Sequence, residues 1–258
     1  MADSLEVRVY NVRFGDAILV TVPDRDPANG TVTKRRILID VGNAPTVAST
    51  EGGDDSVFKP VIDDILEQLD GRPLDLYVMT HEHLDHVQGL PHAAWKLYPQ
   101  DFSTHFRVDH AWLTASAASD YYDSHPEAKK KKLAFKEMHR RLRSFLALNA
   151  LPGHQAMLQI LANNDPTKTS QCVEFLRNLN PAKTRYIYRG ADLKGSHPFR
   201  EAKFEIWAPE EDTSEYYGKF QPLSFGEVPV TNTNVPPPSM IPPSGVDVGA
   251  FLNLVEAR

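Results

Sequence analysis

The sequence contains a single cysteine, Cys172, so neither an intrachain disulfide nor a cysteine-rich metal cluster is possible. No apolar run approaches the ~20 residues that a membrane-spanning helix needs. An excess of basic residues is also missing, because 28 Lys and Arg stand against 34 Asp and Glu, for a net charge of −6. These absences exclude a disulfide scaffold, a helical membrane protein and a chain that is basic throughout for binding nucleic acid.

The rest of the composition is typical of a folded protein. The 258 residues, of which 41% are hydrophobic and 24% charged, suffice for one large domain or two small ones with a buried core. Residues 1–12 alternate between polar and apolar side chains, a pattern unlike that of a signal peptide. We therefore expect a soluble, cytoplasmic protein.

The hydrophobic pattern of the first half predicts alternating strands and helices. Leu5, Val7 and Val9 share one face of a half-buried strand, and the polar stretch 24–36 suits a hairpin connection between two later strands. Residues 57–69 carry apolar side chains at helical spacing. We predict strands over residues 5–9, 17–22, 37–40, 74–80 and 106–114. Strands and helices in this order favour an α/β layered domain.

The second half of the sequence changes character. We interpret residues 115–182 as a helical insertion whose apolar stripe consists of Phe135, Met138, Leu142, Phe145 and Leu146. β-like segments return at residues 185–188 and 203–208. Seven prolines between residues 222 and 243 indicate an extended loop, and residues 246–258 are apolar and periodic.

One polar segment carries ligand-forming side chains, and it directly follows the strand predicted over 74–80. It reads Thr80-His81-Glu82-His83-Leu84-Asp85-His86, with three histidines and an aspartate within six residues. In an extended segment His81 and His83 leave on the same face. The cluster can thus offer two imidazoles to one ion, and Asp85 with His86 to a second. Such ligands suit zinc, or manganese or iron where carboxylates dominate. A solvated polar loop is the alternative.

The string His81-x-His83-x-Asp85-His86 resembles the signature of the metallo-β-lactamase superfamily. Residues 11–19 and 37–42 are similar to the opening of its competence-type subgroup, which is related to the hydrolase domain of DNA-uptake proteins. The resemblance covers residues 5–114 well and residues 185–208 loosely, but not the helical insertion. It implies an αβ/βα sandwich, of which the metallo-hydrolase domain over residues 1–258 is the N-terminal part.

The resemblance also implies roles for individual residues. His81 and His83 would bind one metal ion, and Asp85 and His86 a second, with Asp85 as the catalytic residue that faces a bridging water. Two zinc ions are implied, with manganese or iron as alternatives. Asp40 looks like a buried carboxylate that orients a ligand from behind, although an aspartate that caps a turn is an equal alternative. A metal-activated water attacks the substrate, so no protein nucleophile is needed.

The family pattern includes a downstream aspartate and further histidines, which this sequence does not show. No Gly-Asp pair follows Gly53-Asp54, and no histidine follows His197. Either the chain is the N-terminal part of a longer protein, or the insertion supplies replacements. The candidates are His110, His125, His139 and His154. Of these, we expect His110 to be structural and His139 to be solvated.

A basic helix bears on the choice of substrate. Residues 127–146, which include Lys129–Lys132, hold eight cations against two carboxylates, a charge of +6 that leaves −12 on the rest of the chain. A patch that tracks phosphates would suit a phosphodiester or nucleic acid. The solvated face of an amphipathic helix is the alternative, which we favour.

These observations predict a metal-dependent hydrolase, with phosphodiesters or nucleic acid as the leading substrates. A hydrolase of a small ester, lactam or lactone is the first alternative. The second is a non-catalytic or incomplete metal-binding module that needs a further C-terminal segment, because the downstream ligands are missing.

Overall fold

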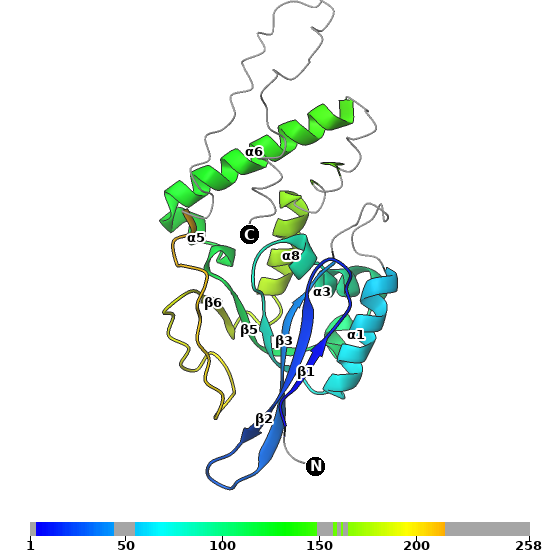
Figure 1. Ribbon diagram of the computed structural model, residues 1–258, viewed down its shortest axis with the longest axis vertical. Helices are drawn as coiled ribbons and strands as arrows, with labels where there is room; N and C mark the ends of the chain where they lie inside the picture. Colours follow the sequence, from blue (N-terminus) through cyan, green and yellow to red (C-terminus); the bar gives the residue numbers. More distant parts are fainter. Residues whose placement is uncertain (1–3, 44–54, 149–156, 159–160, 162–164, 215–258) are drawn as a thin grey trace, which may run out of the picture. The chain divides into compact units, whose positions relative to one another are not determined.

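The computed structural model describes residues 4–43, 55–148, 157–158, 161 and 165–214 (Figure 1). These residues belong to one compact unit, which spans Met1–Gln221. They form a six-stranded sheet in which the strands follow one another in sequence order. The strands are β1 (Glu6–Val9), β2 (Ala17–Arg25), β3 (Val32–Val41), β4 (Leu74–Val78), β5 (Val108–Thr114) and β6 (Thr184–Ile187).

The sheet is mixed, and helical segments fill the connections between its parallel strands. β1, β2 and β3 are antiparallel neighbours, whereas β3 to β6 run parallel. The helix α1 (Asp55–Leu69) joins β3 to β4. The next connection contains α2 (Leu84–Val87), α3 (Gly89–His92), the π-helical turn η1 (Ala93–Leu97) and α4 (Phe102–His105). The last contains the 3-10 turn η2 (Ala115–Ala117), α5 (Tyr121–Ser124), α6 (Pro126–Leu148) and α8 (Pro166–Arg177). This arrangement confirms the predicted α/β class.

The main core lies between one face of the sheet and the helices α1, α3 and α8 (Figure 1). Val57, Val61 and Ile65 recur at helical spacing in α1 and are all buried, as their periodicity predicts. The core also contains Leu19, Leu38, Tyr77, Ala111 and Leu113 from the strands, and Cys172, Val173 and Leu176 from α8. The cysteine therefore serves packing, and α8 belongs to the core layer although it lies within the stretch interpreted as an insertion.

The opposite face of the sheet carries a second, smaller apolar cluster. Trp112 of β5 belongs to this cluster, and its indole Nε1 donates to the carbonyl of Ser196 at 2.9 Å. This bond fastens the segment after β6 to the sheet. The cluster further contains Ile37, Leu76, Ile187, Phe199 and, partly buried, Phe204 and Ile206. Residues 203–208, which the pattern predicts to be β-like, pack here without forming a strand.

The edge strand β1 differs from its prediction. Leu5, Val7 and Val9 are 60%, 52% and 74% exposed, so the expectation of a half-buried strand is wrong for this face. β1 is the first strand of the sheet and pairs only with β2. Alternation of apolar residues reports a common face, but an edge strand is buried only if another element covers that face.

Other sequence predictions fall partly outside the described residues. Residues 185–188 correspond to β6, as predicted. The apolar stripe of α6 is only half-buried: Leu146 is buried, whereas Phe145 is 39% exposed. The proline-rich residues 222–243 and the periodic residues 246–258 lie outside the described part of the chain. No helix of the described part is long and apolar enough to cross a bilayer.

Three segments meet backbone to backbone beneath the histidine-rich turn. A Cβ atom built on Gly42, just after β3, would lie 2.0 Å from the carbonyl carbon of Asp85 and 2.2 Å from the backbone nitrogen of His86. The N–H of Asp16 donates to the carbonyl of Asp85 at 3.2 Å, and the N–H of Gly42 donates to the carbonyl of Asp16 at 2.9 Å. Glycine is thus required at position 42 by space.

Replacement of Gly42 by alanine is expected to lower the free energy of unfolding by ~3 kcal/mol or more, because the new methyl group displaces backbone. Urea-unfolding curves measure the loss. Gly30→Ala is the matched control, since its Cβ would meet nothing within 4 Å and its φ of +73° adds only left-handed strain, about 1 kcal/mol. Equal losses in the two variants would contradict the close approach.

Candidate metal centre

The candidate site lies where three parallel strands end. Asp40 is the second-last residue of β3, the segment from Thr80 follows β4, and β5 ends at Thr114. Because neighbouring parallel strands present their carboxyl ends at one edge of a sheet, the loops that follow them gather there. The polar string at residues 80–86 therefore lies on a rigid base.

Asp40 is the deepest polar residue of the site, with only 1% of its surface exposed. Its φ of 51° is left-handed, a conformation that costs about 1 kcal/mol. Thr80 donates its backbone N–H to Oδ1 at 2.8 Å and its hydroxyl to Oδ2. Nδ1 of His86 lies 3.0 Å from the same Oδ2. The carboxylate thus joins β3 to the start of the motif and to α2.

The ligand-forming side chains gather around His81. Atoms of His81, His83 and Asp85 lie within 4.8 Å of one another, and so do atoms of Asp40, His81 and His86. The ring centroid of His81 is 4.8 Å from that of His83 and 3.7 Å from that of His86. The sequence paired His81 with His83 and Asp85 with His86, whereas the structure forms two triads that share His81. All five selected side chains are brought together.

The arrangement fits a divalent cation. His86 turns Nδ1 toward Asp40, so that Nε2 faces the cluster 3.5 Å from Oδ2 of Asp85. A carboxylate behind an imidazole fixes the ring and its tautomer in this way in metal sites. His83 is exposed, whereas Asp40 and His86 are buried. The cluster therefore has a closed base and an open side, which a catalytic site requires.

The charges of the cluster are set by burial and by its own members. Burial, followed by the nearby His86 and His83, lowers the pKa of His81 to about 4. Burial opposes the charge of His86 as well, but hydrogen bonds to Asp40 and Asp85 outweigh it and raise the pKa to about 9. Burial likewise opposes ionisation of Asp85, and the hydrogen bond and charge of His86 lower its pKa nevertheless. At neutral pH the site thus holds a neutral His81 and a cationic His86.

Asp16 is a neighbour of the cluster that the sequence analysis missed. Its Oδ2 lies 3.5 Å from Nδ1 of His86, and its side chain is 57% exposed. The sequence analysis included Asp16 only within residues 11–19, as part of the family resemblance. The backbone hydrogen bond from Asp16 to Asp85 brings it to the site, and no local pattern signals this contact.

The remaining candidate histidines serve other contacts. His110 is buried in β5, with Nδ1 3.0 Å from a carboxylate oxygen of Asp109. His125 pairs with the carbonyl of Tyr121 at 2.9 Å. His139 is only 4% exposed and pairs with the carbonyl of Leu161 at 2.7 Å, so its prediction as solvated is wrong. His154 lies outside the described residues. A helical position alone did not reveal that another segment covers His139.

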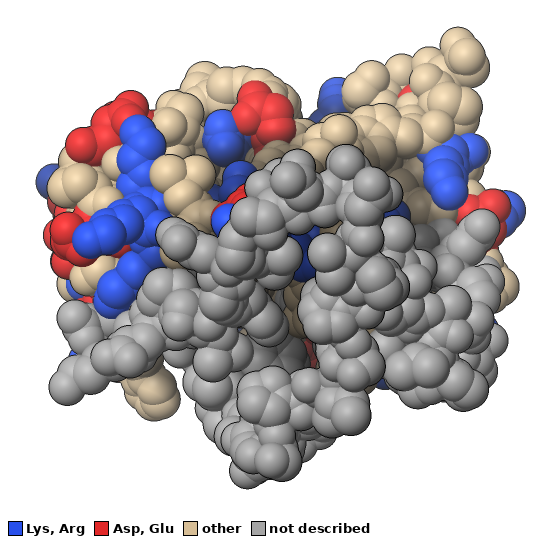
Figure 2. Space-filling view, turned by 90° about the horizontal axis from the view of Figure 1, so that it is seen from above, with Lys and Arg blue, Asp and Glu red and all other residues tan. Residues whose placement is uncertain are grey.

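Much of the basic charge of α6 is engaged locally. Glu137 accepts from both Arg140 and Arg141, Arg143 pairs with Asp165 and Lys129 pairs with Asp123, all at 2.7–2.8 Å. Lys131 donates to the carbonyl of Ser214 at 2.5 Å. On the described part of the face in Figure 2, Lys and Arg side chains lie among Asp and Glu side chains. These ion pairs and hydrogen bonds favour the interpretation of the basic side of α6 as the solvated face of an amphipathic helix.

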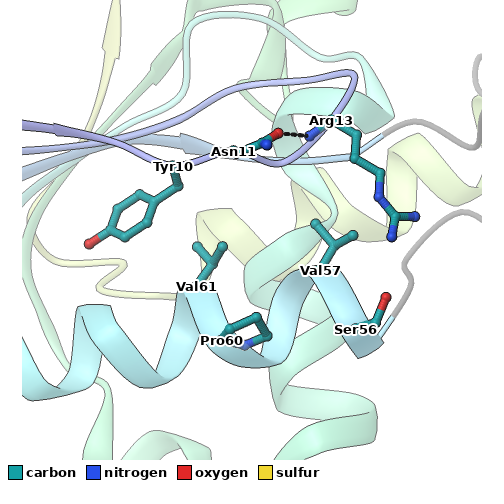
Figure 3. A pocket seen from close by; sticks show the side chains of 7 residues that line it. All are labelled: Tyr10, Asn11, Arg13, Ser56, Val57, Pro60 and Val61. Carbon is teal, nitrogen blue, oxygen red and sulfur yellow. Dashed lines mark hydrogen bonds between the residues drawn. The ribbon is translucent and has the colours of Figure 1, made fainter.

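A pocket of about 320 Å³ adjoins the loop that carries Asp16, but no motif side chain lines it. Its walls come from residues 10, 11 and 13 and from the first turns of α1 (Figure 3). Asn11 accepts the backbone N–H of Arg13 at 3.1 Å, and the Arg13 side chain extends toward Ser56. The lining residues are Tyr10, Asn11, Arg13, Ser56, Val57, Pro60 and Val61. The pocket is separate from the histidine cluster.

Comparisons of the chain with known protein families, curated proteins and solved structures give no match. The functional argument therefore rests on the geometry and chemistry of the cluster.

The metal-free protein is expected to be most stable near pH 6.5. His81, with a lowered pKa, makes stability rise with pH between about 4 and 6.5, because the unfolded chain binds the extra proton there. His86 has a raised pKa, so the free energy of unfolding falls as the pH rises from 6.5 to about 9. In this range the folded chain keeps a proton that the unfolded chain has lost. Urea unfolding in a chelator across this range measures both limbs.

In the variant His86→Gln, the fall of the unfolding free energy above pH 6.5 should disappear. His105→Gln is the control, because His105 is an exposed residue of α4 outside the cluster. A falling limb of full size in His86→Gln would show that another group is responsible.

Proposed function

We propose that this chain is a metal-dependent hydrolase whose cation is held by His81, His83, Asp85 and His86. The observation that carries the proposal is the convergence of these four side chains, backed by Asp40, at the carboxyl edge of parallel strands. Imidazole and carboxylate donors suit zinc first, and manganese or iron next. The resemblance of the motif to that of the metallo-β-lactamase superfamily supports the same chemistry.

The protein side chains have separate tasks in this mechanism. When bound, a divalent cation would lower the pKa of a water toward neutrality and polarise the bond under attack. Asp40 accepts a hydrogen bond from Nδ1 of His86 and so directs Nε2 into the cluster. His81 presents a neutral imidazole at pH 7 because its pKa is about 4. Asp85 is ionised and partly exposed, and we assign it the role of accepting the proton of the attacking water.

The number of ions follows from the sharing of His81. Both triads use this residue, and one imidazole nitrogen binds one ion. We therefore propose one tightly held zinc ion from the described residues. The two-ion centre that the resemblance implies would need a donor from beyond them.

Titration of the purified, metal-free chain with Zn²⁺ tests the proposed function. We expect about one ion per chain in the wild type, and His81→Ala should weaken binding by ~100-fold or more, because it removes a donor from both triads. His105→Ala is the control, since His105 is an exposed residue of α4. A wild type that binds no zinc, or an alanine variant that binds as tightly, would contradict the proposed site.

The substrate class that we place first is the phosphodiester. Among the described residues, Lys130 and Lys136 are the cations of α6 with neither an acidic partner nor a hydrogen bond, since Lys131 donates to the carbonyl of Ser214. They are therefore the side chains of this helix that remain available for phosphates. A small ester, lactam or lactone would not need them.

Cleavage of a single-stranded oligonucleotide by the zinc-loaded protein is expected to fall roughly fivefold in Lys130→Gln/Lys136→Gln, and to fall with salt in the wild type. Hydrolysis of p-nitrophenyl acetate should be unchanged. Lys34→Gln/Lys194→Gln removes the same charge from exposed positions outside α6 and serves as the control. Equal oligonucleotide cleavage by both double variants would remove α6 from substrate binding.

A metal-binding module without catalysis is the second candidate. Among the described residues, the two triads of the cluster draw their donors from residues 40 and 81–86, and no further histidine joins them. Tight zinc binding without hydrolysis of any ester would favour this candidate, and would direct attention to a further segment or partner that completes the site.

A further inference from the structure

Glu82 stands between two proposed metal ligands, yet its carboxylate contacts other parts of the chain. Oε1 accepts a hydrogen bond from the hydroxyl of Ser116 in η2 at 2.5 Å. Oε2 lies 3.7 Å from Nζ of Lys132 in α6. His81 and His83, by contrast, contact each other and the rest of the cluster. Glu82 lies at a bend of the chain, and its carboxylate binds residues outside the cluster, so it holds the ligand segment (residues 80–83) through contacts that involve no proposed metal ligand.

Lys132 is held in place by its own contacts and is not a freely exposed surface cation. It donates to the hydroxyl of Tyr122 at 2.9 Å, and Nζ lies 4.0 Å from the centre of the Tyr122 ring. Only 25% of its side chain is exposed. Burial lowers the pKa of Lys132, and the other charged neighbours that act on it are the cations Lys136 and Arg177, so Glu82 is the acidic group that offsets both effects.

The ligand segment is anchored at both ends, and Glu82 provides its third anchor. Thr80 is bound to Asp40 by its backbone N–H and its hydroxyl. The carbonyl of His83 accepts the N–H groups of His86 and Val87 at 3.0 and 3.1 Å. Between these ends the backbone carries both His81 and His83, and a small rotation there would separate their imidazoles.

We propose that Glu82 is a positioning residue, which holds His81 and His83 in the geometry for metal binding through its contacts with Ser116 and Lys132. The inference rests on the proposed function. It extends that function to Lys132 of α6, which contacts none of the proposed metal ligands. Fixed ligand orientation raises metal affinity, and supporting contacts of ligands are typically worth tenfold or more. Metal affinity therefore depends on a lysine that lies 50 positions after Glu82 in the sequence.

A double-mutant cycle on Co²⁺ affinity tests the proposal, with the absorption spectrum of Co²⁺ as a second readout. We expect Glu82→Gln and Lys132→Met each to weaken Co²⁺ binding by about tenfold, and the double variant to be little weaker than either single one. The spectrum should change in Glu82→Gln because the ligand geometry relaxes. Lys132→Arg, which keeps the cation, should recover most of the affinity.

Two controls separate positioning from general stability. Lys129→Met removes the exposed pair with Asp123, 2.8 Å long, from the same helix and should leave Co²⁺ affinity within about twofold of the wild type. Urea unfolding in a chelator reports the stability of every variant without metal. Lys132→Met lies far from the ligands in sequence, so it keeps the test valid if the Glu82 variants fold poorly.

The possible results are distinct. Wild-type affinity in Glu82→Gln and Lys132→Met overturns the inference and leaves the proposed function intact. Strictly additive losses, or losses that follow the unfolding free energy across all variants, overturn it as well, because they indicate independent or purely structural roles. A wild type that binds neither Co²⁺ nor Zn²⁺ refutes the proposed function itself, and the inference with it.

Discussion

The hydrogen bonds of the Asp40 carboxylate are the constraint on which the site depends. A buried carboxylate is costly unless it is paired, and Asp40 is 1% exposed. It is satisfied only if Thr80 and His86 approach from β4 and α2. The left-handed backbone at Asp40 leads directly into Gly42, whose missing side chain lets β3 touch the turn at Asp85. One acidic side chain thus holds three segments together.

The same network determines the protonation state of His86. His86 remains cationic to a pH of about 9 because Asp40 and Asp85 flank it. The proposed metal ion would bring its positive charge to the same part of the cluster as the charge of protonated His86. Binding of a cation by Nε2 would therefore exchange a proton for a metal, a coupling common to histidine-containing metal sites. The base of the cluster is closed by polar contacts, whereas the side at His83 is open. The exchange of a proton for a metal ion is therefore compatible with a stable fold.

The helix α6 contributes more through its contacts than through its overall charge. Several of its cations are bound to Glu137, Asp123 and Asp165, and Lys132 is directed to the back of the ligand segment. A count of charges along the sequence treats these side chains alike. Their contacts divide them into cations that pair within the fold, one that pairs with Glu82, and two without a partner among the described residues.

The sequence by itself determined the local features of this protein. Period-two and helical patterns predicted the strands and α1, and the spacing of His81 and His83 predicted that they lie together, because all of these depend on neighbours within a few residues. The tertiary structure alone decided which faces are covered and which distant groups meet. Val9 is exposed because β1 is an edge, and His139 is buried because residue 161 approaches it. The contacts of Asp40 with His86 and of Glu82 with Lys132 join residues some 50 positions apart, and no local periodicity encodes the packing that brings them together.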